Sequence, residues 1–179
     1  MKQIGEFKLK DGRMVQIVLP SMQGLKQITD FVNKLSQEDT FLSFSGEQYS
    51  LAFEKNWLKN ALNEIKFGKN YIIWALYNNQ IIGGADVKKG GTRDTHVGTI
   101  GLMVDKDFRG QGLGKLLLDF VLKKAKEEKY KIVKLDVFAD NFIAINLYLK
   151  MGFKEYGRLP KAFYRKNKFS DKLEMYKNI

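Results

Sequence analysis

A glycine-rich segment between an apolar run and an amphipathic helix constrains this chain more than any other feature. Residues 108–117 read FRGQGLGKLL and follow the apolar residues Leu102, Met103 and Val104. Glycines let a backbone turn sharply and approach a ligand closely, and the free N–H groups at the start of a helix attract anions. The segment therefore predicts a strand, a tight loop and a helix whose first turn binds a phosphate group.

Two common nucleotide-binding loops do not fit this spacing. A P-loop would need a glycine at Arg109 and a hydroxyl side chain at Leu116. A dinucleotide-binding fingerprint fits poorly, because its third glycine would come one residue after Gly114 and its strand would end closer to the loop. A third arrangement remains, in which the backbone of residues 109–115 binds a pyrophosphate at the helix start.

Hydrophobic periodicity predicts a mixed order of strands and helices. Ser21 is expected to cap the first helix, and Asn78 with Asn79 to form a hairpin turn. Only residues 96–138 make a strand–helix–strand unit, so we expect an α+β fold with helices on both faces of the sheet, in one domain over residues 1–179. Expected strands span 13–19, 71–77, 80–88, 96–104, 131–138, 153–158 and 171–176, and expected helices span 21–35, 47–65, 112–129 and 141–151.

Composition narrows the partners and the compartment. The net charge of +11 favours anionic partners, but the lysines are scattered without a compact arginine patch, so we do not expect nucleic acid as a partner. The absence of cysteine excludes disulfides, thiolate zinc sites and a cysteine nucleophile, and fits a cytoplasmic protein. No apolar run is long enough to cross a bilayer and no apolar signal begins the chain, so we expect no membrane partner.

A second segment, residues 141–153, reads NFIAINLYLKMGF. Asn141, Ala144 and Tyr148 stand at positions i, i+3 and i+7, which places them on one face of a helix that Gly152 ends. Asn141 can hydrogen-bond an amide-containing ligand, Ala144 leaves room for it, and Tyr148 can donate a proton. Taken alone, each of these residues is better explained as a helix cap or a packing residue.

Together the two segments resemble the GCN5-related N-acetyltransferase (GNAT) superfamily. The first is similar to its motif A, Arg/Gln-x-x-Gly-x-Gly/Ala, at Arg109, Gly112 and Gly114. The C-terminal residues 157–176 loosely resemble the branch that contains ribosomal-protein N-terminal and spermidine acetyltransferases. The second segment is similar to the pattern Asn-x-x-Ala-x-x-Leu-Tyr-x-x-x-Gly-Phe, at Asn141, Ala144, Leu147, Tyr148, Gly152 and Phe153.

The resemblance implies the GNAT fold, a central mixed and mostly antiparallel sheet with a splayed parallel strand pair, and acetyl-CoA as cosubstrate. It allows a homodimer, because members of the superfamily are often dimeric. The backbone of Leu102, Met103 and Val104 would pair with the pantetheine arm, which Asn141 would also contact, and Tyr148 would lie near the sulfur. The pyrophosphate would be bound by Arg109, Gly110, Gln111, Gly112, Leu113, Gly114 and Lys115.

By the same resemblance, a primary amine attacks the thioester directly, with Tyr148 as the general acid and no metal ligands assigned. The resemblance does not identify the general base, because the strand HVGTIGLMV lacks a carboxylate. His96, Glu47 and Asp86 are candidates, and a water chain or an amine that loses its proton on binding are alternatives. A non-catalytic acyl-CoA-binding regulatory module is the alternative function.

The amine acceptor could be a protein N-terminus, a polyamine or another small amine. Glu47 and Glu54 could pair with a cationic amine. Several aromatic residues between the first two expected helices could line its pocket or simply pack the helices together: Phe41, Phe44, Tyr49, Phe53 and Trp57.

Overall fold

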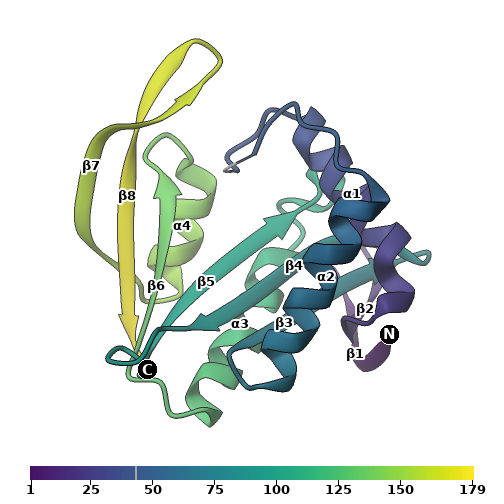
Figure 1. Cartoon of the computed structure of the whole chain (residues 1–179). Helices are drawn as coiled ribbons and strands as arrows, with labels where there is room; N and C mark the ends of the chain where they lie inside the picture. Colours follow the sequence, from purple (N-terminus) through teal and green to yellow (C-terminus); the bar gives the residue numbers. More distant parts are fainter. Residues whose placement is uncertain (43) are drawn as a thin grey trace.

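In the computed structural model of the chain, the described residues 1–42 and 44–179 form one eight-stranded sheet with four α-helices (Figure 1). Across the sheet the strands follow the order β1-β2-β3-β4-β5-β6-β8-β7. The strands are β1 (Lys2–Lys8), β2 (Met14–Leu19), β3 (Asn70–Tyr77), β4 (Gln80–Lys89), β5 (Val97–Val104), β6 (Ile132–Phe138), β7 (Lys154–Arg165) and β8 (Lys168–Asn178). The helices are α1 (Leu25–Gln37), α2 (Leu51–Lys66), α3 (Leu113–Glu127) and α4 (Phe142–Lys150), with short 3-10 turns η1 (Met22–Gly24) and η2 (Lys106–Phe108).

One parallel strand pair interrupts an otherwise antiparallel sheet. Strands β5 and β6 pair in parallel from Val97 with Ile132 to Thr99 with Lys134, and then diverge, as Figure 1 shows. Every other pairing among the described strands is antiparallel. This confirms the expected α+β fold with a splayed parallel pair, and it leaves the second half of β5 without a neighbour on its β6 side.

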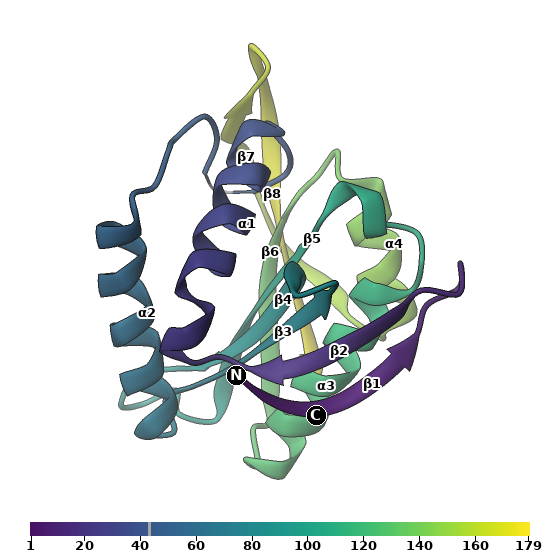
Figure 2. The same ribbon diagram turned by 90° about the vertical axis from the view of Figure 1, so that its right-hand side faces the viewer.

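Helices cover both faces of the sheet, each over its own apolar core (Figure 2). Helices α1 and α2 pack on one face through side chains such as Phe31 and Leu58, whereas α3 packs on the other through Leu117 and Val121. Full burial of such side chains contributes about 1.5–3 kcal/mol each. The two faces of the sheet, and of β5 within it, are therefore covered by different helices.

Several local predictions were wrong. The two closing strands, expected at 153–158 and 171–176, are longer and span Lys154–Arg165 and Lys168–Asn178. Strand β1 was not expected, because its sequence KQIGEFK is largely exposed and contains a glycine. Ser21 makes no side-chain cap bond and precedes η1, so α1 begins only at Leu25. Helix α2 begins at Leu51 rather than at Glu47, because the Ser50 hydroxyl accepts a hydrogen bond from the Phe53 N–H (3.2 Å) and caps the helix there.

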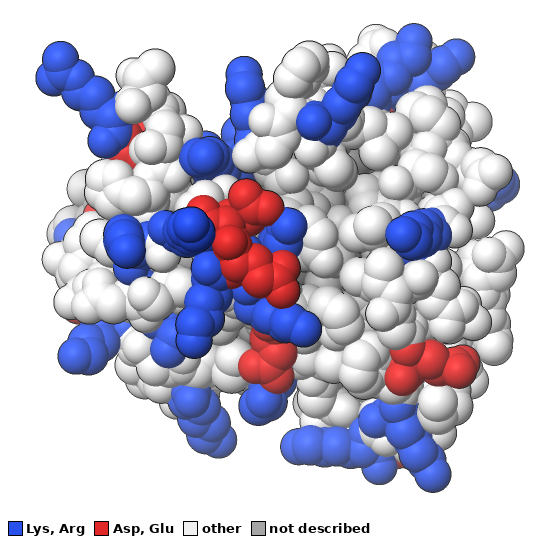
Figure 3. Space-filling view, turned by 90° about the horizontal axis from the view of Figure 1, so that it is seen from below, with Lys and Arg blue, Asp and Glu red and all other residues white. Residues whose placement is uncertain are grey.

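Other local signals were confirmed. Asn78 and Asn79 have φ angles of 48° and 60° and join β3 to β4 as a tight hairpin. Gly152, at φ 84°, follows the end of α4. Basic side chains are spread over the face drawn in Figure 3, with acidic ones among them. Among the described helices, none is long and apolar enough to cross a membrane.

Candidate functional site

The second half of β5 has one open edge. It remains paired with β4 on one side, Leu102 opposite Ala85 and Val104 opposite Gly83, but has no pairing with β6 beyond Thr99. Backbone groups alternate in direction along a strand. Because the Asp105 N–H donates to the Ile82 carbonyl of β4 (2.9 Å), the groups of Leu102 and Val104 point the other way, into the gap. An extended ligand that contains amides could pair with this edge.

The start of α3 lies at the end of this gap and is built from glycines. Gly110 and Gly112 have φ angles of 76° and 91°, and the Gly112 cap carries no side-chain hydrogen bond. A Cβ atom at Gly110 would meet open space, whereas one at Gly114 would lie 3.2 Å from Leu147 Cδ2 and 3.7 Å from Leu102 Cδ2. The third glycine therefore lets α3, α4 and β5 come together, and the first two leave the helix start accessible to an anion.

Side chains around this glycine loop mainly hold it in place. The Arg109 side chain turns inward: its Nε donates to the Val104 carbonyl (2.9 Å) and its Nη2 to Glu38 (2.7 Å). The Gln111 carbonyl accepts a hydrogen bond from the Lys10 N–H (3.2 Å), which links the loop to the turn between β1 and β2. The Arg109 guanidinium is therefore engaged within the protein.

The two other sequence-predicted residues of the loop differ in exposure. Leu113 is the first residue of α3 and its side chain is fully buried in the core, so only its backbone could contact an anion. Lys115 lies on the exposed face of α3 and pairs with Asp119 (2.7 Å). An exposed pair of this kind contributes little to stability, so the Lys115 ammonium can move to an anion at small cost.

Helix α4, whose Leu147 side chain lies near Gly114 at the start of α3, carries Asn141 at its N-terminus and Tyr148 in its last turn. Asn141 Oδ1 accepts a hydrogen bond from the Ala144 N–H (3.2 Å), so the side chain caps α4. Tyr148 is 7% exposed and packs against Phe153, with ring centroids 5.8 Å apart. Burial raises the pKa of Tyr148 to about 12, so the phenol keeps its proton at neutral pH. Tyr148 can therefore act as a proton donor.

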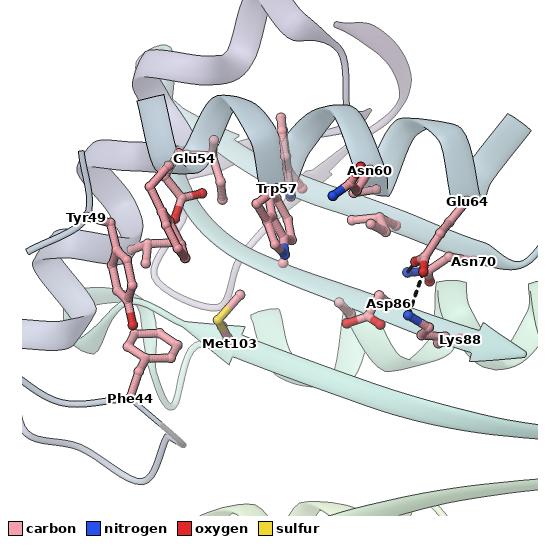
Figure 4. A pocket seen from close by; sticks show the side chains of 18 residues that line it. Phe44, Tyr49, Glu54, Trp57, Asn60, Glu64, Asn70, Asp86, Lys88 and Met103 are labelled. Atoms are coloured by element: carbon pink, nitrogen blue, oxygen red, sulfur yellow. Dashed lines mark hydrogen bonds and ion pairs between the residues drawn. The ribbon is translucent and has the colours of Figure 1, made fainter. Parts of the chain in front are cut away.

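A cavity of about 530 Å³ lies on the other face of β5, between α1, α2 and the sheet (Figure 4). The Met103 side chain lies in its wall, whereas Leu102 and Val104 pack on the α3 side. Strand β5 thus separates the gap from the cavity and contributes to both. The polar and aromatic lining includes Phe44, Tyr49, Phe53, Glu54, Trp57, Asn60, Glu64, Asn70, Asp86 and Lys88.

Of the three candidate bases, Asp86 is the one that lines this cavity among the described residues. Its carboxylate occupies the space that a side chain at Gly101 would fill. Burial raises the pKa of Asp86 to about 6, with Lys88 acting against this shift and Glu64 adding to it. His96 is exposed at the start of β5. Glu47 is also exposed and accepts a hydrogen bond from the Ser45 N–H (2.6 Å).

Of the five aromatic residues for which pocket lining and helix packing were both possible, Phe44, Tyr49, Phe53 and Trp57 line the cavity and Phe41 does not. Phe41 packs on Phe138 (5.6 Å between ring centroids), and the Arg165 guanidinium lies 4.0 Å from its ring centre. Sequence reasoning missed Trp74 in the cavity wall, and it expected Met103 only as a backbone contact for the cofactor, whereas the Met103 side chain lines the cavity. The stretch IIGGADV in β4 carried a usable signal, because a lone aspartate there interrupts an apolar and small-residue strand.

Comparisons with known proteins agree with this geometry. A model of the Acetyltransferase (GNAT) family matches residues 30–153. N-alpha-acetyltransferase 30 of Dictyostelium discoideum is 33% identical over 160 residues, which span 89% of this chain and 78% of that protein. A crystal structure of an acetyltransferase of GNAT family from Streptococcus pneumoniae has the same fold, with a TM-score of 0.82, 24% identity and coverage of 92% of this chain and 99% of that one. So does a ribosomal L7/L12 alpha-N-protein acetyltransferase in complex with coenzyme A, with a TM-score of 0.79, 13% identity and coverage of 92% and 94%.

Proposed function

The chain belongs to the acetyltransferase (GNAT) family and is an N-acetyltransferase that uses acetyl-CoA, and on that premise we propose direct acetyl transfer to a primary amine bound in the cavity beneath α2. The position of β5 carries this proposal. Its open edge faces the gap in front of α3, and its Met103 side chain faces the cavity. Donor and acceptor can therefore meet across a single strand.

The gap fits the chemistry of acetyl-CoA. We propose that the Leu102 backbone groups and the Val104 N–H pair with the amides of the pantetheine arm, beside Met103, because they point into the gap. The Val104 carbonyl is already engaged by the Arg109 side chain. The Asn141 Nδ2 group is a further donor for an amide, since the cap uses only Oδ1. The backbone of residues 110–115 would bind the pyrophosphate, because it combines two glycines at positive φ with the start of a helix.

The resemblance implies that Arg109 contacts the pyrophosphate directly, but we propose a structural role for its side chain instead. Its guanidinium bonds to Glu38 and to the Val104 carbonyl, so we propose that it holds the loop against β5. A charge-assisted bond to a mostly buried carboxylate is a strong restraint of this kind.

The absence of cysteine supports our further proposal of a cytoplasmic location.

Acetyl-CoA supplies the activated acetyl group as a thioester. The protein must remove a proton from the amine and return one to the leaving sulfur. We propose Asp86 as the base and Tyr148 as the acid. Burial moves both pKa values upward, to about 6 and about 12, so near pH 7 the carboxyl group is mostly ionised and the phenol is protonated. Each group thus holds the protonation state that its role needs.

Replacing Tyr148 tests the proposed function. For Tyr148→Phe we expect turnover to fall by roughly 100-fold, within the range of general acid catalysis, while the Kd for acetyl-CoA stays within a factor of about two. Thiol release with a panel of amines measures turnover, and calorimetry measures the Kd. Tyr156→Phe, a change at a half-exposed tyrosine of β7, is the matched control and should leave both unchanged.

Two outcomes would contradict this proposal in different ways. Unchanged turnover in Tyr148→Phe would remove Tyr148 as the acid. Tight acetyl-CoA binding by the unmodified protein without thiol release for any amine would instead indicate the non-catalytic acyl-CoA-binding module.

A further inference from the structure

One buried carboxylate in the cavity wall has no cationic partner within residues 1–42 and 44–179. Glu54, in the first turn of α2, is 4% exposed and lines the cavity (Figure 4). Among the described residues, no hydrogen bond or ion pair reaches the side-chain oxygens of Glu54. By contrast, Glu64, which lies at one end of the same cavity wall, pairs with Lys88 (2.6 Å). Burial raises the pKa of Glu54. A buried carboxylate without a partner destabilises a fold, so a ligand that brings a positive charge would satisfy it.

The walls next to Glu54 also suit a cation. The ring of Tyr49 lies 5.1 Å from that of Phe53 and 6.1 Å from that of Phe44, and Trp57 follows one turn after Phe53 on α2. Aromatic faces attract organic cations most strongly where water is partly excluded. This end of the cavity therefore combines a carboxylate with aromatic surfaces.

The charge of the cavity is opposite to that of the whole chain. Its charged lining consists of Glu54, Glu64, Asp86 and Lys88, which gives a formal charge of −2 (three acids against one lysine). The chain as a whole carries +11. Since the surrounding surface repels cations, a negative cavity is a selective place for them.

The two unpaired acids lie at different depths along the cavity. Helix α2 runs beside β4 in the same direction, and the Glu64–Lys88 pair marks a common level (Figure 4). From that level back to Glu54 the helix rises roughly 15 Å. Back to Asp86 the strand covers roughly 7 Å. Glu54 therefore lies roughly 8 Å farther along than Asp86 by the same rises.

We infer that the acceptor is a small organic amine with a second cationic group, which Glu54 and its aromatic neighbours bind while Asp86 faces the reacting nitrogen. This rests on the proposed acetyl transfer. Asp86 lies opposite Gly101, next to Leu102 on the open edge of β5, so the reacting end belongs there. A short apolar chain between the two nitrogens would run along the aromatic wall.

Binding of matched amines tests the second charge directly. With the full-length chain and calorimetry, diaminopentane should bind at least about tenfold more tightly than pentylamine, the value of one charged hydrogen bond. Glu54→Gln should abolish that difference between the two amines. The substitution keeps shape and removes an unpaired buried charge, so the thermal midpoint should not fall. Glu127→Gln, on the exposed surface of α3, is the matched control and should behave as the unmodified chain.

The outcomes separate this inference from the proposed function. Equal binding of the two amines, or a peptide α-amine preferred over diaminopentane, would overturn the second charge. Retention of the difference in Glu54→Gln would overturn the role of Glu54. Thiol release with pentylamine tests acetyl transfer separately. Selective binding of diaminopentane without acetylation of any amine would sink the transfer proposal and leave the cation site standing.

Discussion

The two sides of β5 are built in different ways. On the gap side, most of the proposed contacts are backbone groups of Leu102, Val104 and residues 110–115, close together in the sequence, with the Asn141 side chain added from α4. On the cavity side, side chains from α1, α2, β3, β4 and β5 converge from distant parts of the chain. A site made of backbone is encoded by a short motif, whereas a site made of side chains depends on how the helices pack on the sheet. The same contrast predicts that substitutions on one side should leave the other side intact.

The largest effect is expected from Asp86→Asn on the cavity side. Loss of a general base lowers kcat/KM by roughly 10² to 10⁴-fold, while the acetyl-CoA Kd should stay unchanged. In the unmodified protein, kcat/KM should rise with pH through about 6 as the Asp86 carboxyl group ionises. The groups that face it are Lys88 on β4 and Glu64 on α2. Thiol release measured across pH follows this rise in kcat/KM. If the rise near pH 6 persists in Asp86→Asn, Asp86 is not the base.

Asp86→Asn is expected to have a smaller effect, in the favourable direction, on the free energy of unfolding. Burial raises the pKa of Asp86 from 3.8 to about 6, so the folded state binds the proton more tightly than the unfolded state. The resulting stabilisation is present below about pH 4 and is lost as pH rises through about 6, a change of about 3 kcal/mol. Glu54 acts in the same direction. Asp86→Asn should therefore raise the free energy of unfolding in urea at pH 7.5 by up to about 3 kcal/mol, and a loss of stability there would refute this account.

The smallest effect is expected on the gap side, from Gly112→Ala. At φ 91° an alanine is strained by about 1–2 kcal/mol, and relief of that strain would distort the helix start. We expect the acetyl-CoA Kd to rise about tenfold, with amine binding unchanged. Gly68→Ala is the matched control, because Gly68 also has a positive φ of 63° and open space but lies after α2. Equal loss of acetyl-CoA affinity in both variants would show a general stability effect.

Local signals explain which parts of the fold could be predicted. The β3–β4 hairpin, the β5–α3–β6 unit and α4 each carry their own turn or cap residues, and they were found. Strand β1 pairs only with β2 at the edge of the sheet, so its sequence needs no buried alternation. The spacing of Leu51, Leu58, Leu62 and Ile65 predicts a helix over residues 47–65, but it does not define where that helix begins. The tertiary bond from the Tyr49 N–H to Asn33 Oδ1 (2.7 Å) favours another backbone path.

The site was predictable to the same extent. Gly112 and Gly114 stand where the motif places them, but the bond of Arg109 to Glu38 joins residues 71 apart and has no local signal. That Asp86 and Trp57 line one cavity depends on how α2 packs against β4. The sequence alone named Asp86 as one of three candidates, and only the fold separated it from His96 and Glu47.

Arg165 joins two parts of the chain that are distant in sequence, one of which supplies residues to the proposed acceptor cavity. Its guanidinium stacks on Phe41, and its Nη1 donates to the Asp39 carbonyl (3.1 Å), a residue 126 positions away. The segment that supplies Phe44 and Tyr49 to the cavity is thereby tied to the hairpin of β7 and β8. The residues proposed to contact acetyl-CoA do not include any residue of this hairpin. We therefore expect a change in the length of this hairpin to alter the proposed amine site before it alters the proposed acetyl-CoA site.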